Sequence, residues 1–325
     1  MSVLIYIESA NNKIKKSAYE VASYASAIAE KLSTSVTATV IGDVENSEIM
    51  SLAKYGVSKA VHVNNDKLKN FANQAYASVI AEIAKKEQAN VIVLSNSLSG
   101  KALAPRIAIK LNAGIVDGAL ALPEINADKF IVRKTAFSSK AFAYVELSSA
   151  IKVISLNPNA YEIVKKAVDL TIEAYNPEVR DRDLKAVIKE ISQVSNKVSL
   201  ADADIVVSAG RGLKGPENWG MIEELANLLG AATACSKPVS DAGWRPHSEH
   251  VGQTGLAISP NLYIAIGISG AIQHLAGVSS SKTIVVINKD PEAPFFKVAD
   301  YGIIGDAFEI VPKIIQELKS LKANS

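Results

Sequence analysis

Residues 204–274 read DIVVSAGRGLKGPENWGMIEELANLLGAATACSKPVSDAGWRPHSEHVGQTGLAISPNLYIAIGISGAIQH. Near their start, a short apolar run at 205–207 precedes the glycine-rich segment GRGLKG at 210–215, and apolar residues then recur at helical spacing from 221 to 229. This order predicts a strand, a glycine loop and a helix, with Pro216 in the first turn of the helix. Because a helix N-terminus offers free N–H groups and the positive end of the helix dipole, the loop is a predicted phosphate site.

A second turn of the same kind follows in the same stretch. Residues 262–266 form an apolar run typical of a buried strand, and GISGA at 267–271 predicts a tight turn. Ser269 is the expected N-cap of a helix over 272–276. Two loops suited to phosphate in one domain indicate a dinucleotide ligand rather than a single phosphate.

Length and composition describe an ordinary globular chain. The 325 residues are enough for about two domains. Apolar residues make up 48% and charged residues 21%, so both domains can bury a core. The net charge of +2 provides no large field, which makes nucleic acid an unlikely partner.

Features of secretion and of membrane insertion are missing from the sequence. The N-terminal residues MSVLIYIES lack the basic region of a signal peptide and the Arg-rich character of a transit peptide. A single cysteine, Cys235, excludes an internal disulfide. The most apolar stretch, 262–272, is interrupted by glycine and serine and is too short to span a bilayer. We therefore expect a cytoplasmic protein without membrane insertion.

The N-terminal half alternates between strand and helix patterns, which predicts parallel βαβ crossovers and a doubly wound sheet. The predicted strands are 3–7, 36–41, 60–63 and 91–94, and the predicted helices are 18–32, 49–55, 71–86 and 103–111. From residue 130 the pattern changes to successive strands at 130–137, 140–147 and 151–156, which predicts an antiparallel addition.

The domain boundary is expected where the composition becomes polar. A further extended segment is predicted at 186–194, and SNKVSLADAD at 195–204 is interpreted as the joint between domains. The predicted domains are therefore 1–195 and 196–325. Both are of the α/β class, and the second is Rossmann-like.

Several long motifs in the C-terminal half resemble one family. In order and spacing, the segments GRGLKGPENW, CSKPVSDAGW, HVGQTG, YIAIGISGAIQHLAG, IVVINKDPEAPFFKVADYGIIGD and VPKI are similar to the FAD-binding half of electron transfer flavoprotein alpha subunits. The N-terminal half resembles the same subunit more loosely. The motifs are specific, because they are long and consecutive, whereas an isolated GxG loop occurs in many α/β proteins.

The resemblance implies an electron carrier that binds FAD and works as a heterodimer. Domain 1–195 would have a nucleotide-hydrolase-like fold and dock the beta subunit, and domain 196–325 would hold FAD. The pair would carry single electrons from flavin dehydrogenases, such as the acyl-CoA dehydrogenases of fatty acid oxidation, to a membrane quinone reductase or another acceptor. Such redox transfer requires no catalytic acid or base.

The resemblance also implies a set of cofactor-binding residues. They are Arg211, Ser236, Lys237, Val251, Gly252, Gln253, Thr254, Ser269, Gly270, Ala271, Ile272, Gln273, His274, Asn288, Asp306 and Ala307. Thr254 would address the flavin N5 atom, Gln253 and the backbone of 251–254 would line the ring, and His274 would approach its O2 edge.

The remaining residues of that set would hold the rest of the cofactor. Arg211, Ser236 and the segment 269–273 are assigned to the ribityl chain and pyrophosphate, and Asn288, Asp306 and Ala307 to adenosine. One position departs from the family pattern, because Lys237 stands where an arginine is usual. A lysine is a point charge that cannot stack or donate in a fork, so the flavin potential is expected to be tuned differently.

Three weaker patterns favour ordinary structural roles. SLSGKA at 97–102 lacks the first glycine and the final Ser or Thr of a Walker motif. GISGA has Ala271 where a nucleophile elbow requires glycine. His247 and His250 have a metal-like spacing, but no third ligand can be identified nearby, so a solvated loop is expected and no metal site is predicted.

Alternative functions remain open from the sequence. The chain could serve flavin-based bifurcation, depending on whether its partner holds AMP or a second FAD. It could instead be a flavin- or NAD-dependent oxidoreductase domain with its own substrate, or a subunit whose cofactor site is a relic.

Overall fold

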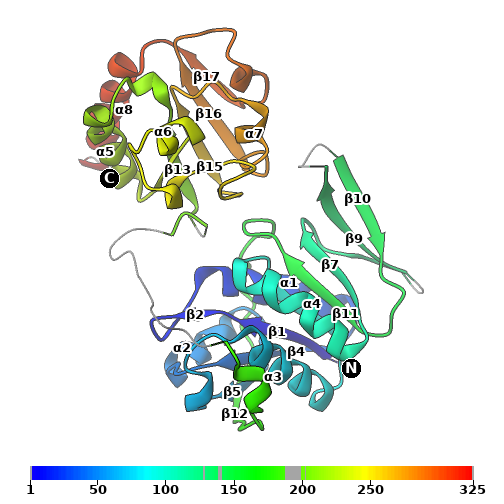
Figure 1. Cartoon of the computed structure of the whole chain (residues 1–325). Helices are drawn as coiled ribbons and strands as arrows, with labels where there is room; N and C mark the ends of the chain where they lie inside the picture. Colours follow the sequence, from blue (N-terminus) through cyan, green and yellow to red (C-terminus); the bar gives the residue numbers. More distant parts are fainter. Residues whose placement is uncertain (1, 127–128, 138–140, 187–198, 202, 324–325) are drawn as a thin grey trace. The chain divides into compact units, whose positions relative to one another are not determined.

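The computed structural model describes residues 2–126, 129–137, 141–186, 199–201 and 203–323 (Figure 1). The chain divides into two compact units, Met1–Ser192 and Gln193–Ser325. The predicted boundary between residues 195 and 196 lies outside the described residues, as does all but the first residue of the predicted extended segment 186–194. No helix of the described part is long and apolar enough to cross a bilayer.

The N-terminal unit is built on a ten-stranded sheet with the order β10-β9-β7-β11-β6-β1-β4-β5-β12, in which β8 pairs with β9. The strands from β7 to β12 in this order are parallel, whereas β8, β9 and β10 pair antiparallel. Their bounds are β1 Ser2–Ile7, β4 Ser35–Ile41, β5 Lys59–Val63, β6 Ala89–Ser95, β7 Gly114–Ala119, β8 Glu124–Asn126, β9 Lys129–Ala136, β10 Ala141–Glu146, β11 Lys152–Leu156 and β12 Thr171–Ala174; the short β2 Ser9–Ala10 and β3 Lys13–Ile14 pair separately.

The predicted doubly wound sheet with an antiparallel addition is confirmed, with one correction. Residues 151–156 were expected in the antiparallel part, but β11 lies between β6 and β7 and is parallel to both. The residues Val153 to Leu156 are buried. A strand that is covered on both faces has a continuous run of apolar residues, which is typical of the interior of a parallel sheet. Hydrophobic periodicity alone does not distinguish such a strand from an antiparallel one.

Helices cover both faces of this sheet. Val3 and Ile5 of β1 share one core with α1, whereas Leu4 and Tyr6 share the other with α3 and α4. The helix bounds are α1 Lys16–Lys31, α2 Asn46–Met50, α3 Asn73–Lys86 and α4 Leu98–Leu111, with 3-10 turns η1 Ser51–Lys54, η2 Asp66–Leu68 and η3 Asp181–Leu184.

The C-terminal unit has a five-stranded, fully parallel sheet with the order β14-β13-β15-β16-β17 (Figure 1). The strands are β13 Ile205–Ala209, β14 Ala232–Cys235, β15 Leu262–Ile266, β16 Thr283–Asn288 and β17 Tyr301–Ile304. The helices are α5 Gly220–Leu229, α6 Lys237–Asp241, α7 Ile272–Leu275 and α8 Ala307–Ala323, with 3-10 turns η4 Arg211–Leu213, η5 Pro216–Trp219, η6 His247–Glu249 and η7 Pro294–Lys297. The predicted Rossmann-like second domain is thereby confirmed.

Alternate residues of β15 face two different cores. Ile264 and Ile266 pack with α5 and α8, whereas Tyr263 and Ala265 face the other side, where Phe295 of η7 packs. The chain runs from β13 to β14 on one side and returns to β15 on the other side of β13. The gap between the carboxyl ends of β13 and β15 is therefore the topological switch point, where open α/β sheets bind their ligands.

Two local predictions in this unit need correction. Pro216 does begin the predicted helical segment, but its first turn is the 3-10 turn η5, and the α-helix α5 begins only at Gly220. The expected N-cap Ser269 does not cap α7, because the cap position is Ala271 and carries no side-chain hydrogen bond. Gly270, with a φ of +84°, separates Ser269 from the helix.

Candidate functional site

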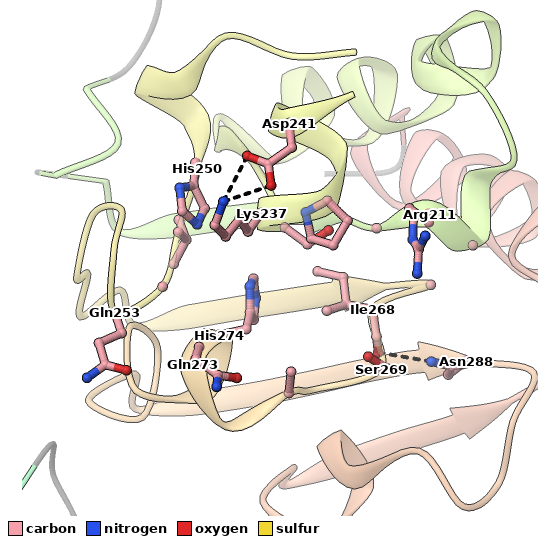
Figure 2. A pocket seen from close by; sticks show the side chains of 18 of the residues that line it. Arg211, Lys237, Asp241, His250, Gln253, Ile268, Ser269, Gln273, His274 and Asn288 are labelled. Carbon is pink, nitrogen blue, oxygen red and sulfur yellow. Dashed lines mark hydrogen bonds and ion pairs between the residues drawn. The ribbon is translucent and has the colours of Figure 1, made fainter. Parts of the chain in front are cut away.

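A cavity of about 670 Å³ lies at the switch point of the C-terminal unit (Figure 2). Its walls come from the segments that directly follow β13, β14, β15 and β16, together with residues 250–253 and α7. Cofactor sites typically have volumes of about 300 to 1,000 Å³. Eleven of the predicted cofactor-binding residues line it: Arg211, Ser236, Lys237, Val251, Gly252, Gln253, Ser269, Ala271, Gln273, His274 and Asn288.

Glycines bring the turns after β13 and β15 together without side chains. The Gly212 N–H donates to the Gly267 carbonyl over 3.1 Å, and the Gly210 N–H donates to Ile266 over 3.0 Å. A Cβ atom at Gly212 would lie 2.7 Å from the Gly267 Cα, a distance that real Cβ contacts do not show. Only glycine fits there, and Gly210, Gly212 and Gly267 present no side chain at the cavity wall, which allows close approach of a ligand.

Asn288, at the end of β16, holds the turn that follows β15. Its Nδ2 donates to the Ile268 carbonyl over 2.9 Å (Figure 2). Its Oδ1 accepts from the Asp290 N–H over 3.1 Å. Asn288 thus fixes one wall of the cavity as well as lining it. Its assignment to adenosine stays a prediction.

His274 is a buried titratable group of the cavity wall. Its side chain rises from α7 in the middle of the cavity (Figure 2), and the residue is 7% exposed. Its Nε2 lies 2.8 Å from the Tyr263 hydroxyl, while its buried Nδ1 has no hydrogen-bond partner among the described residues. Burial, followed by the proximity of His250, lowers the pKa of His274 to about 4, although the Val251 backbone partly offsets this. The imidazole is therefore neutral near pH 7.

Lys237 forms an ion pair at the mouth of the cavity. Its Nζ lies 2.9 and 2.7 Å from the two carboxylate oxygens of Asp241, one helical turn away, and both side chains are more than half exposed. The hydrogen bond from Lys237 lowers the pKa of Asp241. The positive charge of Lys237 is thus largely compensated by Asp241 of the same helix, α6.

His250 corrects the prediction of a solvated loop. Its ring is buried and lines the cavity, and its carbonyl accepts from the Leu256 N–H over 2.9 Å. Burial, followed by the nearby His247, lowers the pKa of His250. His247 itself is exposed. No group of three possible metal ligands occurs in the described part of the chain.

Ion pairs explain why this polar segment is packed. Arg245 donates to Glu249 over 2.7 and 2.8 Å and to Glu223 of α5 over 2.9 Å, and its guanidinium lies over the Trp219 ring at 5.3 Å. The Arg245 side chain is only 14% exposed. These contacts fasten the segment that carries His250 to the body of the domain.

Five predicted residues do not line the cavity: Thr254, Gly270, Ile272, Asp306 and Ala307. Thr254 is exposed in the turn next to Gln253. The Asp306 carboxylate accepts from the Phe308 N–H over 2.9 Å and so caps the start of α8. The proposed contacts of these residues with the flavin and adenosine stay predictions.

Eight residues of the cavity wall are missing from the predicted cofactor-binding set, although four of them lie in the two loops predicted for phosphate, at 210–215 and 267–271. They are Gly210, Gly212, Pro238, Asp241, His250, Gly267, Ile268 and Asp290. Most of them directly follow a strand of the parallel sheet, and this position is itself a signal, because carboxyl ends of parallel strands converge on the ligand.

The wall fits an extended cofactor with a flat polar ring at one end and phosphates at the other. Figure 2 shows Arg211, Ser269 and Asn288 towards one end and His250 and Gln253 towards the other, with His274 between them. The side-chain-free glycine turns suit a pyrophosphate. The unpartnered, buried Nδ1 of His274 requires a partner that the described part of the chain does not supply.

Comparison with known proteins identifies that cofactor. Residues 3–196 match the family model of the electron transfer flavoprotein domain, and residues 199–279 match that of the electron transfer flavoprotein FAD-binding domain.

Similar proteins cover nearly the full chain. The electron transfer flavoprotein subunit alpha of Thermoanaerobacterium thermosaccharolyticum is 38% identical, with 98% of both chains covered. That of Syntrophomonas wolfei is 36% identical, covering 97% of this chain and 98% of the relative, and that of Bacillus subtilis is 36% identical with 89% of both covered. The family resemblance is thus confirmed: the chain belongs to the electron transfer flavoprotein alpha subunits, and FAD is the cofactor of its C-terminal domain.

Proposed function

We propose that the chain is the alpha subunit of a cytoplasmic, heterodimeric electron transfer flavoprotein. It carries single electrons from flavin dehydrogenases, such as acyl-CoA dehydrogenases, to a membrane quinone reductase or another acceptor. The observation that carries the proposal is the cavity at the switch point, because its glycine turns suit phosphates while the buried, unpartnered donor His274 suits a ring whose charge changes.

When bound, FAD supplies the one-electron redox chemistry. In the proposed arrangement, the glycine turns with Arg211, Ser236 and the segment 269–273 bind the ribityl chain and pyrophosphate. Asn288, Asp306 and Ala307 bind adenosine. Gln253, Thr254 and the backbone of Val251 and Gly252 line the ring.

His274 and Lys237 tune the ring electrostatically. A neutral imidazole can donate a hydrogen bond without adding a charge to the buried site, and such a bond strengthens as the acceptor becomes negative. The interior position of His274 increases this effect, because the effective dielectric constant is lower than in water. The exposed Lys237 contributes less, because Asp241 compensates its charge and solvent screens it.

The N-terminal unit, residues 1–195 in the proposed division, docks the beta subunit. It exposes several large apolar side chains to solvent, although solvent contact does not stabilise such groups. Leu98 and Ile109 of α4 are 74% and 84% exposed, and Phe142 and Tyr144 of the edge strand β10 are each 60% exposed. Apolar groups on an edge strand commonly mark a surface that a partner covers.

Co-expression with a beta subunit tests the proposal. We expect a one-to-one complex on sizing and a flavin absorption spectrum. An acyl-CoA dehydrogenase and its substrate should reduce the flavin, whereas the substrate alone should not. A stable flavin-loaded monomer without affinity for any beta subunit would contradict the heterodimer.

Other outcomes distinguish the alternatives. A second flavin in the partner would favour bifurcation over simple electron carriage. Oxidation of a small substrate without any dehydrogenase would favour an oxidoreductase, and a complex without flavin would indicate a relic site.

A further inference from the structure

Tyr263 lies behind the cavity wall, on the face of β15 that packs against Phe295. Its side chain is fully buried, and its hydroxyl lies 2.8 Å from His274 Nε2. Tyr263 does not line the cavity. It therefore reaches the cofactor site only through His274.

Hydrogen-bond satisfaction determines where the protons of this pair lie. A neutral imidazole has one N–H donor and one acceptor nitrogen. If Nε2 carried the proton, the buried phenol O–H would need a different acceptor, whereas the neighbouring Ser208 hydroxyl of β13 acts on Tyr263 as a donor, because it lowers the pKa that burial raises. If the phenol donates to Nε2, its proton is satisfied and the imidazole proton lies on Nδ1.

We propose that Tyr263 is a positioning residue that holds the His274 imidazole as the Nδ1–H tautomer and presents this N–H to the flavin. Nδ1 is the buried nitrogen without a partner, so it is the one that needs an acceptor from the ligand. The presentation of the Nδ1–H group to the flavin rests on the proposed function, whereas the assignment of the tautomer does not.

The neighbouring elements explain why His274 needs such a support. α7 has only four residues and begins without a side-chain cap, so the helix alone does not fix the ring. Phe295 meets the ring edge-on at 5.8 Å between centroids, which limits tilting of the ring but provides no hydrogen bond. The Tyr263 hydroxyl thus makes a hydrogen bond that distinguishes Nε2 from Nδ1, while the Val251 backbone also acts on the ring and partly offsets the lowering of its pKa by burial.

Nitrogen NMR of the full chain, with 15N-labelled histidine, tests the tautomer directly. His62 serves as an internal reference, because its Nε2 lies 2.9 Å from the Gly42 carbonyl, which can only accept, so this histidine must be the Nε2–H tautomer. We expect the opposite pattern for His274, with a protonated Nδ1 and an unprotonated Nε2. Assignment of a proton to His274 Nε2 in the wild-type chain would overturn the proposal, and this measurement requires no variant.

The variant Tyr263→Phe removes only the hydroxyl. We expect His274 to lose its single tautomer and the flavin-loaded complex to accumulate about fivefold less of the one-electron-reduced state, the factor expected for one ordinary hydrogen bond. Tyr24→Phe is the matched control, because Tyr24 is equally buried and donates to the Ala121 carbonyl over 3.0 Å in the other unit. The control should lose comparable stability without either effect.

The two readouts separate the tautomer from the proposed function. If Tyr263→Phe leaves both the tautomer and the reduction equilibrium as in Tyr24→Phe, Tyr263 is a packing residue and the proposal fails. If the tautomer changes but the flavin equilibrium does not, His274 does not donate to the flavin, and the presentation step is wrong. If the chain binds no flavin, the proposed function fails while the tautomer assignment still holds.

Discussion

In the proposed arrangement, His274 affects the flavin potential through a single hydrogen-bond donor. The hydrogen bond to a negatively charged acceptor is worth about 1.5 to 3 kcal/mol, which for one electron corresponds to roughly 60 to 130 mV. His274→Ala should therefore lower the first one-electron potential of the flavin by this amount. FAD should remain bound, because its other contacts are along the pyrophosphate and adenosine. Spectroelectrochemical titration measures the shift.

A purely structural role of His274 would give a different result. His62→Ala is a suitable control, because His62 also makes one ring hydrogen bond, in its case to the Gly42 carbonyl, but lies in the N-terminal unit. Unchanged potentials with a lowered melting temperature of the His274 variant would show that this histidine only packs.

The lowered pKa of His274 makes the stability of its domain depend on pH. The unfolded chain takes up this proton below about pH 6.5, whereas the folded chain does so only near its pKa of about 4. Folding therefore loses stability as the pH falls from about 6.5 to 4, by about 2 kcal/mol at pH 5. His250, whose pKa is also lowered by burial, acts in the same direction.

Melting curves of the FAD-free chain at about pH 7.5 and pH 5 check this dependence. His274→Gln removes the titrating group and keeps a polar side chain beside Tyr263. This variant should lose about 2 kcal/mol less than wild type on acidification. An equal loss in both proteins would place the acid sensitivity elsewhere.

Asp241 should oppose the charge of Lys237 at the cavity mouth. Asp241→Asn leaves this lysine uncompensated, so the flavin potential should rise, and Lys237→Gln should shift it in the opposite direction. Both shifts should shrink as salt is added, because the pair is exposed. Glu309→Gln, an exposed change on α8 outside the cavity wall, should have no effect. Shifts of equal sign in the Asp241 and Lys237 variants would contradict the pairing.

The role of a single residue was predictable where a sequence motif surrounds it. It was unpredictable where contacts with residues distant in sequence determine its burial. His274 lies within a family motif, so the sequence indicated it. Tyr263 alternates with apolar residues along a buried strand and gave no polar signal. His250 was placed in solvent because HSEH is a polar segment, whereas the contacts of Arg245 with Glu223 and Trp219, far away in sequence, hold it in the domain.

The glycine turns are the elements on which FAD binding should depend most. Gly212→Ala would place a Cβ 2.7 Å from the Gly267 Cα, so the two turns must separate. We expect weaker FAD retention and a lower melting temperature. Gly220→Ala is the matched control, because nothing lies within 4 Å of its added Cβ and it begins α5. It should be neutral or stabilise by up to about 1 kcal/mol.

Gel filtration in the presence of dilute FAD, with flavin absorbance per chain as the readout, compares the two variants. Equal FAD retention in Gly212→Ala and Gly220→Ala would show that the close approach of the turns does not shape the cofactor site.

Elements with strong periodicity were predictable, and elements formed by pairing were not. Val36 to Ile41 corresponds to β4, and the helical pattern at 71–86 to α3. The strands β7 and β12 have few apolar residues and were missed. These strands form because a neighbouring parallel strand supplies hydrogen bonds to them. The local β-propensity of a segment does not indicate such pairing.

Each of the two units has its own hydrophobic cores. The cores around α1 and around α3 and α4 contain only residues of the N-terminal unit, and those beneath α5 and α8 and around Phe295 contain only residues of the C-terminal unit. A unit with its own core can unfold on its own. The whole chain should therefore show two unfolding transitions rather than one.

FAD should shift only one of these transitions, because every residue of the cavity wall belongs to the C-terminal unit. FAD at about 100 times its dissociation constant stabilises the folded unit by about 2.7 kcal/mol, or roughly 10 °C.

The chain has two tryptophans, Trp219 and Trp244, and both lie in the C-terminal unit. Their fluorescence therefore reports the unfolding of this unit alone, whereas circular dichroism follows both units. The fluorescence midpoint should rise with FAD while the second dichroic transition stays fixed. In Gly212→Ala the rise should be smaller at the same FAD concentration. Joint movement of both transitions would mean that the units unfold as one, and that FAD binding stabilises the N-terminal unit as well.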